Sequence, residues 1–297
     1  MKRDLKKIVN QMTLEEKAGM CSGLDFWHLK HVERLGIPEV MVSDGPHGLR
    51  KQDDKGDHLG MNDSIKAVCF PPAALSACSF DRKLVKEMGK TIGKEAQAND
   101  VSIVLGPAVN IKRSPLCGRN FEYYSEDPYV SGTIAATMTE GVQSNYGCGT
   151  TIKHFACNNQ EDNRMGVDAQ VSERALREIY LRGFEIAVKE SRPVAIMSSY
   201  NLLNGVHVAN SVDLCTAIAR KEWGFDGVIM SDWNTTVPED GSIPWKCVTA
   251  GNDIIMPGNA ADAENIRKAF EDGKLSEEVV RMCAGRILNL IHTLTAE

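Results

Sequence analysis

The sequence predicts an α/β fold, a (β/α)8 TIM-type barrel that forms a single domain over residues 1–297. Short apolar segments alternate with longer segments of helical periodicity, which is typical of a parallel sheet flanked by helices. This alternation fits an open, doubly wound sheet as well as a closed barrel. No GxGxxG motif follows an early strand, so the dinucleotide-binding form of the open sheet loses support. The length is ordinary for a barrel, for which about 250 residues is typical.

Six segments are predicted to be buried parallel strands. They are rich in Val and Ile and are bounded by Gly or Pro, as expected for strands covered on both faces. They comprise residues 40–43, 102–105, 150–153, 194–198, 227–230 and 253–256. Closing a barrel takes eight strands, and the two weaker candidates lie near residues 68–71 and 206–209.

Helical periodicity occupies most of the sequence between these strands. Ser172 followed by Glu173 is typical of a helix N-terminus. The polar segments 51–63 and 235–244 are predicted to be loops at the strand ends, where barrels carry the loops that cover a substrate. The predicted helices comprise residues 81–99, 127–143, 172–190, 211–222, 259–271 and 276–294.

The composition restricts the partners and the compartment of the protein. A net charge of −6 without a basic stripe argues against nucleic acid and anionic membranes, because both bind basic surfaces. No run of about 18 apolar residues predicts a membrane span, and the N-terminus does not read as a signal peptide. The nine cysteines are odd in number and form no CxxC pair, so neither a zinc ribbon nor a redox motif is supported. Free thiols predict a cytoplasmic protein.

Polar side chains follow several of the predicted strands, and in a barrel they would converge on one face. An acidic residue at a strand end beside a tryptophan suits sugar chemistry. The carboxylate can attack or stabilise an oxocarbenium-like centre, and the indole can stack on the sugar ring. Lys, His, Arg and Asp around them can bind several hydroxyl groups. The converging residues are Asp44, Arg119, Lys153, His154, Tyr200, Asp232 and Trp233.

Each of these residues also has a plainer interpretation. Asp232 alone could be a helix N-cap, and Arg119 could simply pair with Glu122 or Glu126. Lys153 is less ordinary, since a lysine inside an apolar strand needs a partner or a pocket. The prediction of a site therefore depends on the convergence of these residues and not on any one of them.

Taken in order, the motifs resemble the N-terminal barrel of glycoside hydrolase family 3, the family of many β-glucosidases and β-xylosidases. The resemblance covers essentially the whole chain. The matching motifs are Met12-Thr13-Leu14-Glu15-Glu16-Lys17, Ser43-Asp44-Gly45-Pro46-His47-Gly48-Leu49-Arg50, Gly106-Pro107-Ala108-Val109-Asn110-Ile111, Gly118-Arg119-Asn120-Phe121-Glu122-Tyr123-Tyr124-Ser125-Glu126-Asp127-Pro128, Lys153-His154-Phe155, Ser199-Tyr200-Asn201 with Asn204-Gly205, and Ser231-Asp232-Trp233.

The resemblance implies retaining hydrolysis of a terminal, non-reducing β-D-glucosyl residue in a small β-glucoside or oligosaccharide. Asp232 matches the nucleophile, which would form a covalent glycosyl-enzyme that water then releases. Met197 and Trp233 match residues that line the −1 subsite. The resemblance implies no metal and no organic cofactor. The residues that match those holding the sugar are Asp44, Arg50, Arg119, Lys153, His154 and Tyr200.

The sequence departs from the family pattern at the acid/base residue. Retaining chemistry needs a second carboxyl about 5–5.5 Å from the nucleophile. Most β-glucosidases of the family take it from a second α/β domain, which is absent here. A minority branch uses a His–Asp pair in the loop after the Lys-His strand, but residues 156–164 contain no His.

Three explanations of the missing acid remain open. The one we favour is that the chain is the barrel of a longer protein, in which case its exposed docking surface would promote self-association. Alternatively, a separate chain or a partner protomer of a homo-oligomer supplies the acid. In the third explanation a loop acid such as Glu161 or Asp162 replaces it.

The leading functional hypothesis is therefore a β-glucosidase-type hydrolase, impaired without its acid/base domain. Two alternatives are a sugar-binding barrel without turnover and a scaffold without activity. An aldolase-type barrel is a distant fourth, since it would need Lys153 as a Schiff-base lysine.

Overall fold

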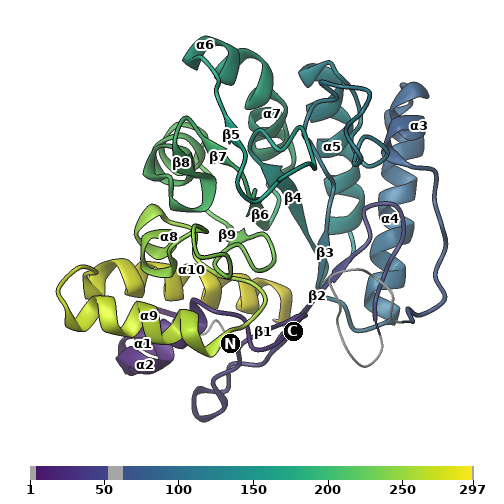
Figure 1. Ribbon diagram of the computed structural model, residues 1–297. Coiled ribbons are helices and arrows are strands. Elements are labelled where there is room, and N and C mark those ends of the chain that lie inside the picture. Colours follow the sequence, from purple (N-terminus) through teal and green to yellow (C-terminus); the bar gives the residue numbers. More distant parts are fainter. Residues whose placement is uncertain (1–4, 53–62, 296–297) are drawn as a thin grey trace.

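The computed structural model describes residues 5–52 and 63–295. Its main sheet is curled and has six strands in the order β1-β2-β3-β4-β6-β9, and all neighbouring strands are parallel except β1 and β2. Helices pack around this sheet (Figure 1). A second sheet has the order β5-β7-β8. The strands are β1 (His28–Leu29), β2 (Val40–Asp44), β3 (Ile103–Leu105), β4 (Gly149–Phe155), β5 (Asp168–Ala169), β6 (Ala195–Ser198), β7 (Leu202–Leu203), β8 (Val206–His207) and β9 (Val228–Ser231).

Five of the six strongly predicted strands are confirmed as β2, β3, β4, β6 and β9. The sixth, residues 253–256, makes only isolated parallel bridges, which join Ile254 to Met230 of β9 and Ile255 to Ser22. These bridges continue the hydrogen bonding past β9 towards the N-terminal segment. The main sheet of the described residues is thus a curled half-barrel that the bridges extend, with six strands where eight were predicted.

Of the two weaker strand predictions, one is wrong and the other is a strand outside the main sheet. Residues 68–71 form no strand, and Pro71 has no N–H group to donate to a ladder. Residues 206–209 contribute β8 to the second sheet, where β8 pairs antiparallel with β7. Asn204 and Gly205 both have positive φ and close this hairpin in two residues. Such a turn returns the chain antiparallel, so the segment cannot be a neighbouring parallel barrel strand.

All six predicted helices are present, two of them in altered form. Residues 172–190 divide into α6, the π-helical η2 and α7, and residues 211–222 contain the π-helix η4. Asp81 and Asp127 cap α4 and α5, each accepting two backbone N–H groups. The helices are α1 (Leu5–Gln11), α2 (Leu14–Met20), η1 (Glu33–Leu35), α3 (Ala73–Cys78), α4 (Arg82–Ala98), α5 (Pro128–Gln143), α6 (Glu173–Ala175), η2 (Leu176–Tyr180), α7 (Arg182–Ser191), η3 (Val208–Asn210), η4 (Asp213–Glu222), α8 (Pro244–Ala250), α9 (Ala260–Glu271) and α10 (Glu277–Thr295).

The two predicted loops differ in how much of them the structure describes. Residues 235–241 form turns and bends, and residues 242–243 lead irregularly into α8, as expected of a loop. Most of the other loop, residues 53–62, lies outside the described residues. Its flanks are joined by a bridge between Gln52 and Ser64.

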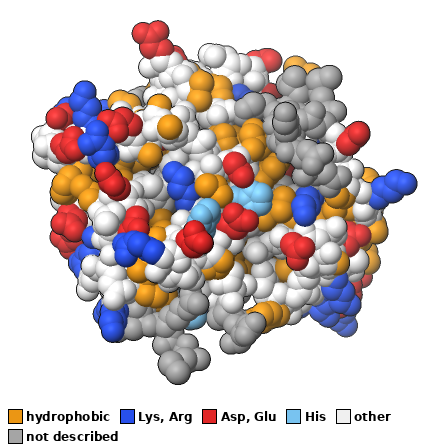
Figure 2. All heavy atoms as spheres, turned by 90° about the horizontal axis from the view of Figure 1, so that it is seen from below, with side chains coloured by type: hydrophobic (Ala, Val, Ile, Leu, Met, Phe, Trp, Pro, Cys, Tyr) orange, Lys and Arg blue, Asp and Glu red, His pale blue; other side chains and the backbone are white. Residues whose placement is uncertain are grey.

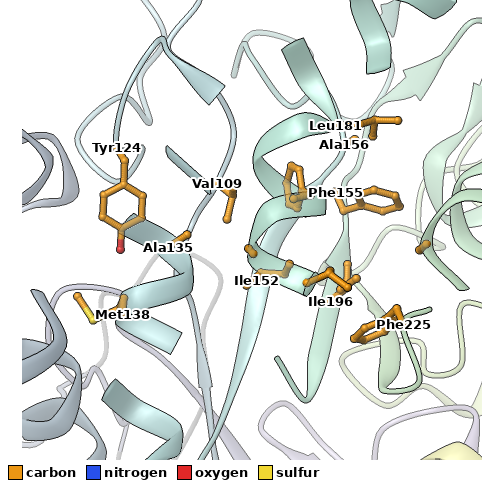
Figure 3. Close-up of a cluster of buried hydrophobic side chains, with 14 of the residues drawn as sticks. Val109, Tyr124, Ala135, Met138, Ile152, Phe155, Ala156, Leu181, Ile196 and Phe225 are labelled. Atoms are coloured by element: carbon orange, nitrogen blue, oxygen red, sulfur yellow. The ribbon is translucent and has the colours of Figure 1, made fainter. Parts of the chain in front are cut away.

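Both faces of the main sheet are buried in apolar clusters. In β6, Ala195 and Met197 pack with Trp233, whereas Ile196 lies between them in sequence and packs with the helices on the other face (Figure 3). Ile229 of β9 lies on the same face as Ile196. This alternation with a period of two is what a strand covered on both faces produces. The sheet is therefore a rigid support for the side chains at its strand ends.

The surface mixes charges of both signs. On the face seen in Figure 2, acidic and basic side chains of the described residues are interspersed with apolar ones. None of the described helices combines the length and the apolar character that crossing a membrane requires. The α1 helix packs on α10, which brings the two ends of the described chain together (Figure 1).

Candidate active site

A cavity of about 670 Å³ opens where strands β2, β4, β6 and β9 end. Parallel strands present their carboxyl ends at one edge of a sheet, so residues far apart in the sequence meet there. The structure brings together all nine residues that the sequence analysis singled out. The cavity is lined by Asp44, Arg50, Arg119, Lys153, His154, Met197, Tyr200, Asp232 and Trp233.

Asp44 ends β2 and holds two cations. Its Oδ1 accepts a hydrogen bond from Lys153 Nζ at 2.9 Å, and its Oδ2 accepts one from Arg50 Nη2 at 3.1 Å. Gly45 allows the tight return of the chain, because its φ is +126° and a Cβ there would lie 2.0 Å from the oxygen of Gly48. Burial works to raise the pKa of Asp44, but the charges of Lys153 and Arg50 lower it to about 2. Asp44 is therefore ionised at neutral pH.

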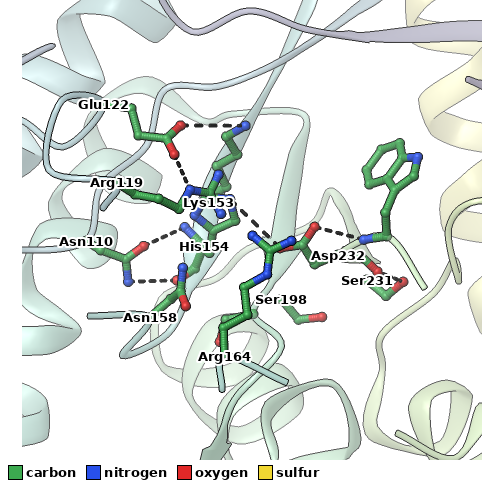
Figure 4. A network of polar contacts seen from close by, with 12 residues as sticks. Asn110, Arg119, Glu122, Lys153, His154, Asn158, Arg164, Ser198, Ser231 and Asp232 are labelled. Carbon is green, nitrogen blue, oxygen red and sulfur yellow. Dashed lines mark hydrogen bonds and ion pairs between the residues drawn. The ribbon is translucent and has the colours of Figure 1, made fainter. Parts of the chain in front are cut away.

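Lys153 and His154 are consecutive on β4, yet both line the cavity. In a regular strand they would face opposite sides. The register between β4 and β6 shifts between Ile152 and Phe155, and this irregularity interrupts the alternation. Asn110 holds the backbone of His154 with hydrogen bonds of 2.8 and 2.9 Å (Figure 4). Burial and then the neighbouring cations lower the pKa of His154 well below its usual value, so the ring is neutral.

A chain of alternating charges runs along the cavity wall. Buried Glu122 accepts a hydrogen bond from Arg119 Nε, and its Oε2 lies 3.9 Å from Lys153 Nζ (Figure 4). Arg119 Nε is also 3.9 Å from Glu161 Oε1, and Glu161 Oε2 pairs with Arg164 Nη1 at 2.9 Å. The plain interpretation of Arg119 as a partner of Glu122 is thus confirmed. Burial lowers the pKa of Arg119, but Glu122, Tyr123 and Asp232 together outweigh this effect, and the pKa lies above its usual value.

Asp232 follows β9 directly and is only 7% exposed. Its Oδ1 accepts a hydrogen bond from the backbone N–H of Trp233 at 2.8 Å. Its Oδ2 is buried and finds no hydrogen-bond partner among the described residues, with His154 Nε2 3.9 Å away. Burial raises the pKa of Asp232, which Arg119 and other neighbours partly offset. A buried oxygen without a partner is costly, and a ligand or a catalytic role is a usual reason for one.

Aromatic side chains supply an apolar part of the wall. The rings of Phe26 and Trp27 lie 6.3 and 5.7 Å from that of Trp233. Trp233 is fixed by its Nε1, which donates to the oxygen of Phe26 at 2.9 Å. The guanidinium of Arg164 lies 4.8 Å from the centre of the Tyr200 ring. Such rings can stack on the apolar face of a sugar.

Several lining residues were not predicted as site residues. His47, Phe121 and Glu122 line the cavity and lie inside motifs that the sequence analysis quoted, so their positions could have been inferred from those motifs. Phe26 and Trp27 come from the segment just before β1, which carries no strand-end signal. Only the tertiary structure places these two rings beside Trp233.

The charged groups of the cavity suit a polar, neutral ligand better than a metal ion. Asp44 is engaged by Lys153 and Arg50, and Glu122 by Arg119, so these carboxylates already have cationic partners. Within residues 5–52 and 63–295, no group of three His, Cys, Asp or Glu side chains is arranged to hold a metal ion. Fixed donors and acceptors of this kind can bind several hydroxyl groups at once.

Comparisons with known proteins agree with this geometry. The family description "Glycosyl hydrolase family 3 N terminal domain" matches residues 29–290. Thermostable beta-glucosidase B from Acetivibrio thermocellus is 52% identical over 289 residues, which are 97% of this chain and 38% of that protein. Exo-alpha-(1->6)-L-arabinopyranosidase from Bifidobacterium longum is 46% identical, with 97% of this chain and 37% of that protein covered.

A solved structure shows the same fold. Beta-glucosidase 3B from Thermotoga neapolitana, in complex with glucose, matches with a TM-score of 0.90 and 42% identity. The match covers 98% of this chain and 43% of that one. The chain thus spans less than half the length of these relatives. By the family match and these relatives together, the chain belongs to the glycosyl hydrolase family 3 N-terminal domain family.

Proposed function

We propose that the chain carries the nucleophile and the sugar-binding subsite of a retaining β-glucosidase. The observation that carries the proposal is the buried, unpartnered Oδ2 of Asp232 in a cavity lined by fixed hydrogen-bonding groups. A cavity of about 670 Å³ is in the size range of small-molecule sites. Relatives named β-glucosidases support glucose as the sugar. The arabinopyranosidase relative makes an α-L-arabinopyranoside the second candidate.

In this mechanism Asp232 Oδ2 attacks the anomeric carbon while the bond from that carbon to the leaving-group oxygen breaks. Water then cleaves the resulting ester and regenerates the carboxylate. Two opposing effects on the Asp232 carboxylate suit this role. Burial keeps the carboxylate poorly solvated, and the charges of Arg119 and Lys153 favour its ionised form. The Oδ2 oxygen therefore lies buried near cationic groups, and no hydrogen bond from the described residues occupies it.

The sugar hydroxyls are expected to bind the charged wall. Asp44 is ionised and can accept hydrogen bonds, whereas Lys153 and Arg119 can donate them. His154 is neutral and presents Nε2 towards the nucleophile. Trp233 offers an apolar surface for the ring. Each group is held by a partner outside the ligand, so binding needs little rearrangement.

The leaving-group oxygen also needs a proton, which calls for a second carboxyl. Glu161 lines the cavity, but its Oε2 is 2.9 Å from Arg164 Nη1 and its Oε1 is 3.9 Å from Arg119 Nε. Both oxygens thus already face guanidinium groups. We therefore assign the acid to another domain or another chain. The length of the relatives, more than twice the matched region, supports this assignment.

We infer that the half-barrel closes into a (β/α)8 barrel within one domain over residues 1–297. The parallel bridges from Met230 to Ile254 and from Ser22 to Ile255 extend the sheet past β9 towards the N-terminal segment and support this closure.

Mass spectrometry of the chain after incubation with 2-deoxy-2-fluoro-β-glucosyl fluoride tests the nucleophile. Fluoride leaves without acid assistance, so this reagent does not depend on an acid/base carboxyl. We expect a mass gain that maps to the peptide containing Asp232, and no gain in Asp232→Asn. Labelling of another peptide, or labelling of the Asn variant, would contradict the assignment. If no label forms, a glucose titration by calorimetry separates a sugar-binding barrel from a chain that does not recognise glucose.

Leaving-group dependence tests the assignment of the acid. We expect slow but measurable turnover of aryl β-glucosides with acidic phenols, and very little turnover of cellobiose, because poor leaving groups depend most on protonation. Equal efficiency on both would show that the chain contains its own acid. Glu161→Gln is the matched test. If Glu161 were the acid, this variant would lose turnover of cellobiose while still being labelled by the fluoride.

A further inference from the structure

Tyr123 lies behind His154 and forms part of a buried hydrogen-bonding chain. The tyrosine is fully buried, and its hydroxyl oxygen lies 3.4 Å from His154 Nδ1. Asn158 Nδ2 donates to that hydroxyl oxygen at 3.1 Å, and the hydroxyl can itself donate to the backbone oxygen of Asn158 at 3.3 Å. The Tyr123 and His154 rings meet edge to face, with centroids 6.3 Å apart. Figure 4 shows His154 between Asn158 and Asp232.

We propose that Tyr123 is a positioning residue that fixes His154 as the neutral tautomer with its proton on Nε2. A neutral imidazole carries one N–H group, and its other nitrogen is an acceptor. Nε2 faces Asp232 Oδ2, a buried acceptor without a partner, at 3.9 Å. A lone pair on Nε2 would face the lone pairs of that carboxylate, whereas an N–H group is attracted to it. The proton therefore belongs on Nε2.

This tautomer leaves Nδ1 as an acceptor. The hydroxyl of Tyr123 then faces two acceptors, Nδ1 at 3.4 Å and the backbone oxygen of Asn158 at 3.3 Å, and can share its one proton between them. Burial raises the pKa of Tyr123, so the hydroxyl keeps its proton at neutral pH. Asn158 Nδ2 thus donates to Tyr123, and Tyr123 offers its proton to His154 Nδ1 as well as to the backbone oxygen of Asn158. His154 Nε2 points into the cavity. The hydrogen bond made by one ring nitrogen of a histidine decides whether the other nitrogen is a donor or an acceptor.

The inference deepens the proposed function and rests on it for its consequence. In the free protein, Nε2–H points towards Asp232. With a sugar bound, the same N–H donates to a sugar hydroxyl. Without Tyr123, His154 Nδ1 would lose its donor in a buried place, and the proton could move to Nδ1. The ring would then present an acceptor to the cavity in place of a donor.

Nitrogen-15 NMR of the chain labelled at histidine tests the tautomer directly and needs neither ligand nor turnover. The His154 signals are assigned by their loss in His154→Gln. At neutral pH we expect a protonated Nε2 and an unprotonated Nδ1 in the wild-type chain. Tyr123→Phe should shift the Nδ1 signal and redistribute the proton. Tyr124→Phe is the matched control, because Tyr124 is the adjacent buried tyrosine and packs in the apolar cluster of Figure 3.

Two results would overturn the proposal. One is a wild-type His154 with its proton on Nδ1, and this result holds even if Tyr123→Phe does not fold. The other is a folded Tyr123→Phe whose His154 signals match those of the wild type. A glucose titration measures the functional consequence. We expect the affinity for glucose to fall roughly 3–10-fold in Tyr123→Phe and to stay unchanged in Tyr124→Phe. A wild-type chain that binds no glucose would count against the proposed function and leave the tautomer result standing.

Discussion

Replacing Glu122 by Gln should destabilise the fold by about 3–5 kcal/mol, although the two side chains have nearly the same shape. Glu122 is only 4% exposed and lies between two cations, Arg119 and Lys153. The substitution removes the negative charge and leaves the two positive charges in the cavity wall. Lys153 keeps its 2.9 Å contact with Asp44, so Arg119 loses more of its compensation.

The magnitude follows from the distances. At 3.9 Å the attraction between Glu122 and Lys153 is about 4 kcal/mol with an effective dielectric constant of about 20. Glu122 lies closer to Arg119 than to Lys153. Water from the open cavity can solvate the two cations that the substitution leaves behind, which recovers part of the free energy lost from both pairs. Breaking a buried pair by removing one partner typically costs about 3–5 kcal/mol. With an unfolding entropy of about 2.1 cal/mol/K per residue, this chain should lose roughly 5–8 °C in Tm.

Differential scanning calorimetry of the wild type, Glu122→Gln and Glu126→Gln measures the effect. Glu126 lies in the same motif but is exposed, so its substitution should change stability by less than about 0.5 kcal/mol. If Glu122→Gln melted within about 1 °C of the wild type, the reasoning that the buried carboxylate holds two cations would be refuted. A similar loss in Glu126→Gln would point to a general effect of altering this loop.

Two further predictions concern other acidic residues. Because burial raises the pKa of Asp232 and only the ionised carboxylate reacts, the rate of labelling by the fluoro-sugar should fall with decreasing pH already above the usual aspartate pKa of 3.8. A rate that stays constant down to pH 4 would contradict this. Asp253 is fully buried and pairs with Arg220 at 2.6 Å and Arg286 at 2.7 Å, so Asp253→Asn should lower the unfolding free energy by about 3–5 kcal/mol in urea titrations. Asp226→Asn, at an exposed position, is the control and should differ from the wild type by less than about 0.5 kcal/mol.

The strands that could be predicted are those with a local signal. In β2, β6 and β9, a short run of apolar residues ends at a polar one, and burial on both faces follows from that run alone. Residues 253–256 have a similar composition but do not form a full strand. The reason is tertiary, since the carboxylate of Asp253 accepts the N–H of Ile229 at 2.9 Å, where a ladder would use a backbone oxygen. No local sequence pattern predicts that a side-chain carboxylate will accept this hydrogen bond in place of a backbone oxygen.

The hairpin at Asn204-Gly205 shows the opposite case. Its turn signal was present in the sequence, but residues 206–209 were assigned to the barrel because eight strands were expected. The positive φ at both turn positions is a local property of Asn and Gly, and it decides the antiparallel direction of β8. The residues of the turn therefore predict the direction of this segment better than the expected number of strands does.

The amino-acid sequence by itself determined which polar residues end the strands, and hence that Asp44, Lys153, His154 and Asp232 meet at one edge. The tertiary structure alone decided what each of them faces. The burial of Glu122 between two cations and the lack of a partner for Asp232 Oδ2 depend on distances between segments far apart in the chain. A period of two or 3.6 residues specifies which face a side chain is on, but the neighbour across a cavity is set by how separate strands pack.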